Sequence, residues 1–224
     1  MVEIEWWVYP AALAGLLVIS GLLHVVVVAV SKAGTAAKQH GLAALFIGTD
    51  NRTSTSKLQA FLWTYAVLWA MTSLLAGAGV EAFNAALGDN VRDEYLLLLG
   101  GPYAVAIGAK AITTNKVSKD PKLKPAKKGD STAGERVAEI VTDDQGSVDL
   151  GDFQYAVFTL FTLIYFVWAF VDAPEAGLPA VPGTLLILMG VSQAAYITKK
   201  TLPQAPALGR PKTAPEPGDD ARER

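Results

Sequence analysis

Apolar residues in this chain gather into five long blocks instead of recurring singly at helical or strand spacing. Each block runs for about 20 residues with almost no charge, which is about the helical length needed to cross a hydrocarbon core of roughly 30 Å. Because lipid offers the backbone no hydrogen-bond partner, each block is expected to be helical. The pattern predicts an all-α integral membrane protein with five transmembrane helices, at residues 10–31, 58–80, 95–114, 153–172 and 180–199.

The placement of basic residues predicts the orientation of these helices. Lys and Arg concentrate on the cytoplasmic side of membrane spans. Four lie in the 32–57 loop, eight in the 110–152 region and six from Lys199 onward, so only Arg92 of the chain's 19 falls on the other side. The sequence therefore predicts an N-terminus outside and a C-terminus in the cytoplasm.

Three stretches outside the blocks differ in composition. Residues 115–142 begin with a run rich in Lys, Pro, Gly and Ser, which is typical of a flexible basic linker. The DDQG turn lies between two short β-favouring runs and predicts a small hairpin over 138–150. The charged, proline-rich tail 203–224 is expected to be disordered.

Two copies of a helix-pair unit are visible in the sequence. SKLQAFLWT at 56–64 aligns with GDFQYAVFT at 151–159, an offset of 95, and LLLLGGPYAVAIGAK at 96–110 aligns with LLILMGVSQAAYITK at 185–199. Both copies start from the same side of the membrane, which predicts a parallel repeat related by an axis near the membrane normal. The expected organisation is a lone helix in 1–45, a first unit in 46–114, the linker in 115–142, a second unit in 143–202 and the tail.

The quoted segments, together with DNRTST before the first unit and DDQGSVDL before the second, resemble a group of uncharacterised bacterial multi-pass membrane proteins with a duplicated two-helix unit. The resemblance covers residues 46–200 and implies a bacterial inner (cytoplasmic) membrane location, with no reaction attached. More loosely, the chain is similar to small helical membrane effectors of bacterial defence systems.

Composition excludes several kinds of chemistry. The chain has no cysteine and only two histidines, so it lacks the ligands of disulfides, thiol catalysis and cysteine- or histidine-rich metal centres. It also lacks a phosphate-binding glycine loop, a nucleophile elbow and a metalloprotease signature. We therefore expect no enzyme activity, no cofactor and no metal. The lysines of 116–128 have no aromatic residues between them, so anionic lipid is a better partner for them than nucleic acid.

The duplicated polar residues are the candidate site. Gln59 and Gln154 lie about one turn inside their helices, and either bond to neighbouring helices or line a cytoplasmic vestibule. Thr64 and Thr159 follow five positions later, about 140° around the helix. One member of each pair is therefore expected to face the vestibule while the other bonds between helices, and the glutamines are the better vestibule candidates.

Other candidates occur once or mark helix ends. His24 is the ionisable side chain deepest in any span, which makes it a functional candidate, although a bond to a neighbouring carbonyl would also explain it. Lys110 and Lys199 end their helices on the inner side, where they either snorkel to the interface or form an inner basic ring for anions. Gly100, Gly101 and Pro102 interrupt the third span, either for close helix packing or as a gating hinge.

These features favour a non-enzymatic, oligomeric membrane channel or pore-like effector, gated from its cytoplasmic side. The alternatives are a scaffold or anchor that recruits cytoplasmic partners and a small carrier whose two units rock against each other. The expected partners are the lipid bilayer, further copies of the chain, and a cytoplasmic protein or an anionic ligand.

Overall fold

The computed structural model describes residues 4–34, 36–47, 52–88, 93–119, 132–142 and 148–201, and these are almost entirely helical. Within these ranges there is no extended strand. The elements are α1 Val8–Val30, α2 Ala36–His40, η1 Gly41–Leu45, α3 Thr55–Gly88, α4 Asp93–Lys119, α5 Ala133–Ala138, α6 Leu150–Asp172, η3 Pro174–Ala176 and α7 Gly183–Thr201. Helices thus occupy all five of the blocks that the sequence predicts to be helical.

Three of these helices are long and apolar enough to cross a membrane. They are Val8–Val30, Thr55–Glu81 and Leu150–Asp172. The sides of α1 and α6 that face away from the protein carry large apolar side chains, such as Leu17 and Val18 on α1 and Leu160 and Phe161 on α6. Such surfaces suit a hydrocarbon environment better than water, and the prediction of an α-helical membrane protein is confirmed to this extent.

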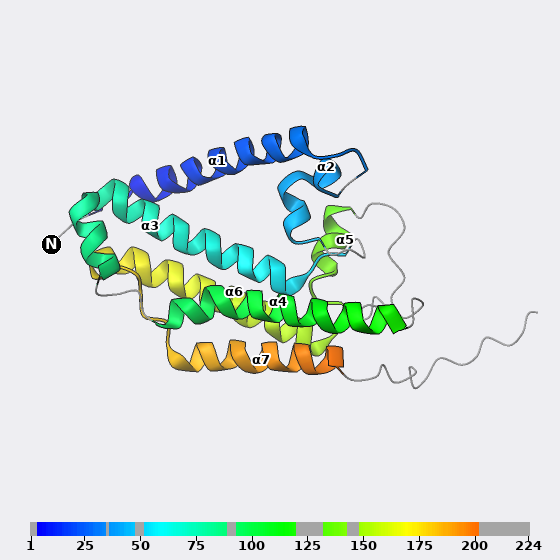
Figure 1. The fold of residues 1–224 in the computed structure, drawn as a ribbon. Coiled ribbons are helices and arrows are strands. Elements are labelled where there is room, and N and C mark those ends of the chain that lie inside the picture. The colour runs from blue at the N-terminus through cyan, green and yellow to red at the C-terminus, as the bar shows by residue number, and fades with distance from the viewer. Residues whose placement is uncertain are drawn as a thin grey trace, which may run out of the picture.

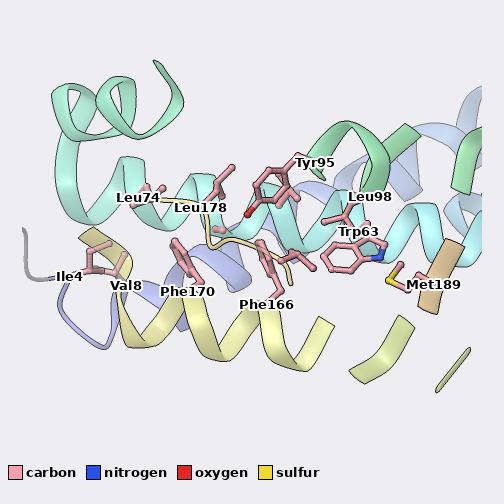
Figure 2. Close-up of a cluster of buried hydrophobic side chains, with 13 residues drawn as sticks. Ile4, Val8, Trp63, Leu74, Tyr95, Leu98, Phe166, Phe170, Leu178 and Met189 are labelled. Carbon is pink, nitrogen blue, oxygen red and sulfur yellow. The ribbon is translucent and has the colours of Figure 1, made fainter. Parts of the chain in front are cut away.

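Helices α3, α4, α6 and α7 form a bundle in which α3 lies beside α4 and α6, and α7 beside α4 and α6 (Figure 1). Large side chains from all four helices meet at its centre, where Trp63, Leu98, Phe166 and Met189 are buried (Figure 2). On α6 the buried side chains recur every three or four residues, from Asp152 to Phe170. This spacing places them on one face of the helix.

The first helix packs on the outside of the bundle, against α3. The contact is closest near its start, where the Ile4 side chain lies so near Gly77 that a Cβ at that glycine would be 2.7 Å from Cγ2 of Ile4. Trp69 of α3 donates from Nε1 to the carbonyl oxygen of Tyr9 at 3.0 Å. Gly77 is therefore a site of close packing between α3 and the segment that leads into α1.

Helix α3 changes direction at Gly79, which has a φ of 79° and a ψ of 176° inside the helix. L-residues with side chains rarely adopt this conformation, whereas glycine does so readily. Close packing does not require glycine at this position, because a Cβ there would meet nothing within 4 Å. Its role is to break the helix.

The segment expected to be a flexible linker contains helical structure. Helix α4 continues to Lys119, and α5 forms over Ala133–Ala138. A capping box starts α5, in which Thr132 Oγ1 accepts from Glu135 N and Glu135 Oε2 accepts from Thr132 N. Residues 120–131, the rest of this linker, lie outside the described residues, as does the tail from residue 202.

The predicted hairpin over 138–150 is reduced to a single antiparallel bridge between Thr142 and Val148, and residues 143–147 lie outside the described residues. Ala138, the first residue of the predicted hairpin, is instead the last residue of α5. Asp149 then starts α6 as its N-cap residue, accepting from Asp152 N at 3.0 Å.

Candidate functional site

Two bridged turns, 46–54 and 141–149, precede α3 and α6 at one end of the bundle, which we call the turn end. Ile47 bridges Thr53, and Thr142 bridges Val148. Each turn is closed by a backbone bond, from Ser54 N to Phe46 O at 2.7 Å and from Asp149 N to Val141 O at 3.0 Å. Every member of the second set lies 95 positions after its counterpart, the same offset that aligns residues 56–64 with 151–159.

The first turn is attached to the segment that leads into the second. Glu139 Oε2 accepts from both the backbone N and Oγ1 of Thr53, at 2.8 and 3.0 Å. Thr55 Oγ1 donates to the carbonyl oxygen of Ile140 at 3.1 Å. These bonds fix the start of α3 against the end of α5. A movement of α5 would therefore be transmitted to the first turn of α3.

Gln59 lies one turn inside α3 and is 2% exposed. Neither its amide oxygen nor its amide nitrogen has a hydrogen-bond partner among the described residues, and the same holds for Nε1 of Trp63, one helical turn further on. An amide left without partners in a protein interior costs about 1–3 kcal/mol for each unsatisfied group. Such groups in a native protein call for an explanation, such as bound water, an ion or a functional role.

Gln154 lies in a different environment, because its side chain is exposed on α6. Five of the six buried positions of α6 have a buried counterpart in α3 at an offset of 96, whereas the turns correspond at 95. A shift of one residue turns the buried face of a helix by about 100°. The buried position of α6 that corresponds to Gln59 is therefore Tyr155 and not Gln154. The corresponding buried pairs are Ser56 and Asp152, Gln59 and Tyr155, Trp63 and Thr159, Ala70 and Phe166, and Leu74 and Phe170.

The two repeated threonines bond within their own helices. Thr64 Oγ1 donates to Ala60 O and Thr159 Oγ1 to Tyr155 O, both at 2.8 Å. Thr64 is partly buried, and Thr159 is buried in the bundle. Because both donors are used locally, only the hydroxyl lone pairs of these residues remain for a ligand.

His24 packs against the segment that follows its own helix. Its Nδ1 accepts from Leu42 N at 3.3 Å, and its ring leaves no room for a side chain at Gly41, where a Cβ would lie 2.2 Å from Cε1. The chain turns back after α1, and Lys38 Nζ reaches the carbonyl oxygen of Val28 at 2.8 Å. The structure thus gives His24 a packing partner in η1, and its side chain remains exposed on the outside of the bundle.

The remaining candidates lie on α4 and α7. Lys110 is exposed on α4, and the side chain of Lys199 lies outside the described part of the chain. Helix α4 runs through Pro102, which is buried, while Gly100 is exposed and a Cβ there would meet nothing within 4 Å. Close packing at Gly100 is therefore not observed within the described structure, and the hinge remains a prediction.

Nothing in the sequence pattern marks Trp63, Tyr155 or Arg136 as functional. The first two read as ordinary core aromatics, and Arg136 as part of a basic linker. Arg136 is recognisable in retrospect because it follows Thr132 and Glu135, whose spacing predicts a capping box and hence a helix.

No match is found for the chain among models of protein families, curated proteins or solved structures. The described residues also contain no group of three or more His, Asp or Glu side chains placed to hold a metal ion.

Proposed function

We propose that this protein is a non-enzymatic, oligomeric membrane channel or pore-like effector that is gated from its cytoplasmic side. In this proposal five helices cross the bacterial inner membrane, α4 and α7 being the two additional spans, and the turn end faces the cytoplasm. The charge distribution along the sequence supports that orientation. The matching turns at an offset of 95 support a duplicated two-helix unit.

The observation that carries the proposal is the buried amide of Gln59, whose polar atoms find no partner among the described residues. Ser56 lies one turn nearer the turn end, and Ser73 lies deeper in α3 with its hydroxyl also unpartnered in the described structure. These α3 positions span about 25 Å at 1.5 Å per residue, which is most of the hydrocarbon thickness. Thr159 and Thr162 add buried hydroxyls on α6.

The pathway would lie inside each chain, between the two helix-pair units. The face of α6 directed away from the bundle is apolar over most of its length, and so is that of α1. A pore lined by these outer faces would be hydrophobic. The polar side chains are instead buried, and Gln59 lies one turn before Trp63, which contacts Phe166 of α6. We therefore assign oligomer contacts to the apolar faces.

The conformation described corresponds to a closed state. Between Gln59 and Ser73 the centre of the bundle is filled by Trp63, Leu98 and Phe166, each no more than 1% exposed (Figure 2). Opening requires these side chains to separate. The bonds of Thr53 and Thr55 to residues 139 and 140 provide a mechanical link from the cytoplasmic segment to α3.

The test compares two glutamines that occupy the same place in the sequence repeat. Gln59→Leu should alter single-channel conductance in a planar bilayer, and it should leave stability in detergent equal or higher, because it removes a buried amide without partners. Gln154→Leu is the matched control, since its side chain is exposed, and should change neither. The proposal fails if wild-type protein passes no current at any voltage. If current flows but Gln59→Leu conducts normally, Gln59 lies outside the pathway.

A small carrier is the second candidate, and it is favoured by the burial of Gln59 one turn before Trp63, which contacts Phe166 of the other unit. A carrier binds its substrate between repeats that rock against each other. It would show saturable flux into vesicles with no unitary current, whereas a channel would show current steps. The same pair of glutamine variants separates a role for the buried amide from a general effect in either case.

A further inference from the structure

Arg136 on α5 is a partly buried cation. Both terminal nitrogens of its guanidinium group are inaccessible to solvent and have no hydrogen-bond partner among the described residues. Guanidinium remains charged at every physiological pH and carries five N–H donors. A desolvated charge without a counterion costs several kcal/mol, so this arrangement calls for an anion.

The carboxylates nearest to Arg136 in the sequence are engaged elsewhere. Glu135 uses Oε2 to accept from Thr132 N in the capping box, at 2.8 Å. Glu139, one turn further on, uses Oε2 to accept from Thr53 N and Oγ1. The i to i+3 ion pair that the sequence would suggest between Arg136 and Glu139 is therefore replaced by the bond between α5 and the first bridged turn.

Arg136 lies three and four positions before Glu139 and Ile140, the two residues that tie the end of α5 to the start of α3. Residues three and four positions apart share one face of a helix, and Glu139 and Ile140 contact Thr53 and Thr55, where α3 begins. The first N–H groups of a helix have no partner within it and carry a partial positive charge. The first turn of α3 thus adds donors that suit an anion and no negative charge of its own.

We propose that Arg136 and the first turn of α3 form a binding site for a phosphate group. The planar guanidinium fork binds two oxygens of a phosphate side by side, and helix N-termini bind phosphate through their free N–H groups. Two sources offer this chemistry at the turn end, the headgroup of an anionic phospholipid and a soluble phosphate compound. The site does not depend on ion conduction, and binding is measured without it.

The experiment uses the full-length protein in lipid nanodiscs and follows its thermal unfolding midpoint. One arm adds inorganic phosphate to discs of phosphatidylcholine, and the other replaces part of that lipid with phosphatidylglycerol at constant salt. A ligand at ten times its Kd should raise the midpoint of the wild-type protein by about 3–6 °C. A shift with phosphate assigns the site to a soluble ligand. A shift with phosphatidylglycerol alone assigns it to lipid.

Arg136→Gln should abolish the shift, and Arg136→Lys, which keeps the charge and loses the fork, should reduce it. Arg136→Lys also keeps the test decisive if Arg136→Gln does not fold. Lys32→Gln removes one charge from the loop after α1 and should leave the shift unchanged. The proposal is overturned if neither phosphate source shifts the wild-type midpoint, as when a carboxylate of the chain already pairs with Arg136. It is equally overturned if both Arg136 variants respond like wild type.

Discussion

The indole of Trp63 on α3 meets the ring of Phe166 on α6 edge-on, with ring centroids 5.7 Å apart and ring planes at 81°. Both side chains are fully buried. This contact joins the first helix of one helix pair to the first helix of the other, and on α3 it lies between Gln59 and Ser73. It is the contact whose loss should most affect both stability and closure.

Trp63→Ala should destabilise the protein by about 3–5 kcal/mol, the usual range for deleting a buried aromatic side chain. Trp168→Ala is the control, because Trp168 lies on the same helix as Phe166 but is 73% exposed, and its loss should cost less than about 0.5 kcal/mol. Unfolding in detergent measures both. Under the channel proposal, liposomes with Trp63→Ala should also leak more ions than those with Trp168→Ala, and equal leak would argue against a gate at Trp63.

Gly41 and Gly34 provide a second matched comparison. Both have positive φ, 55° and 81°, but only Gly41 lies against His24. Gly34→Ala should cost about 1–2 kcal/mol for the left-handed backbone alone, and Gly41→Ala a further 1–3 kcal/mol for the overlap with the ring.

Adding His24→Ala to Gly41→Ala should recover most of that further cost, because it removes the atoms that overlap. Unfolding midpoints of the two single glycine variants and of the double variant measure the effect. Equal destabilisation by Gly34→Ala and Gly41→Ala would show that His24 does not pack against Gly41.

Helix positions were predictable from the sequence because membrane spans need long apolar runs, which leave little ambiguity in α1, α3 and α6. Interruptions within these helices were harder to predict from the sequence. Gly79 resembles the nearby Gly77, and only the tertiary structure shows that one packs against Ile4 while the other breaks the helix. Helix α5 was missed although Thr132 and Glu135 carry the capping signal, because the surrounding Lys, Pro and Gly residues suggested a linker.

The difference between Gln59 and Gln154 could not be predicted from the aligned letters, which are the same at both positions. It arises from packing. Helix α3 carries α1 on its outer side, through Tyr9 and Trp69, whereas the corresponding side of α6 has large exposed apolar residues. The rotation of a helix about its own axis within a bundle depends on the helices packed against it. It therefore cannot be predicted from a short stretch of sequence.

Topology can be tested directly because the chain has no native cysteine. Single cysteines in place of Glu175, in the connection between α6 and α7, and Thr132, before α5, are both at exposed positions. In intact cells, a membrane-impermeant maleimide should label the cysteine at position 175 and not the one at 132, whereas permeabilised cells should show both. The reverse pattern would invert the proposed orientation and place the phosphate site outside.

The buried faces of α3 and α6 correspond at an offset one residue larger than that of the aligned sequences, and this difference can be tested. If the buried faces correspond at an offset of 96, cysteines replacing Gln59 and Tyr155 are both enclosed by the bundle, while a cysteine at position 154 is exposed. In folded protein in detergent, a small maleimide should modify position 154 rapidly and positions 59 and 155 at least tenfold more slowly, because reaction there requires the bundle to open. Denaturant should bring all three to the same rate, which controls for intrinsic reactivity. If positions 59 and 154 react alike and 155 differs, the helices face the bundle as the aligned sequences suggest, at an offset of 95, and Gln154 regains its place beside Gln59 as a candidate for the pathway.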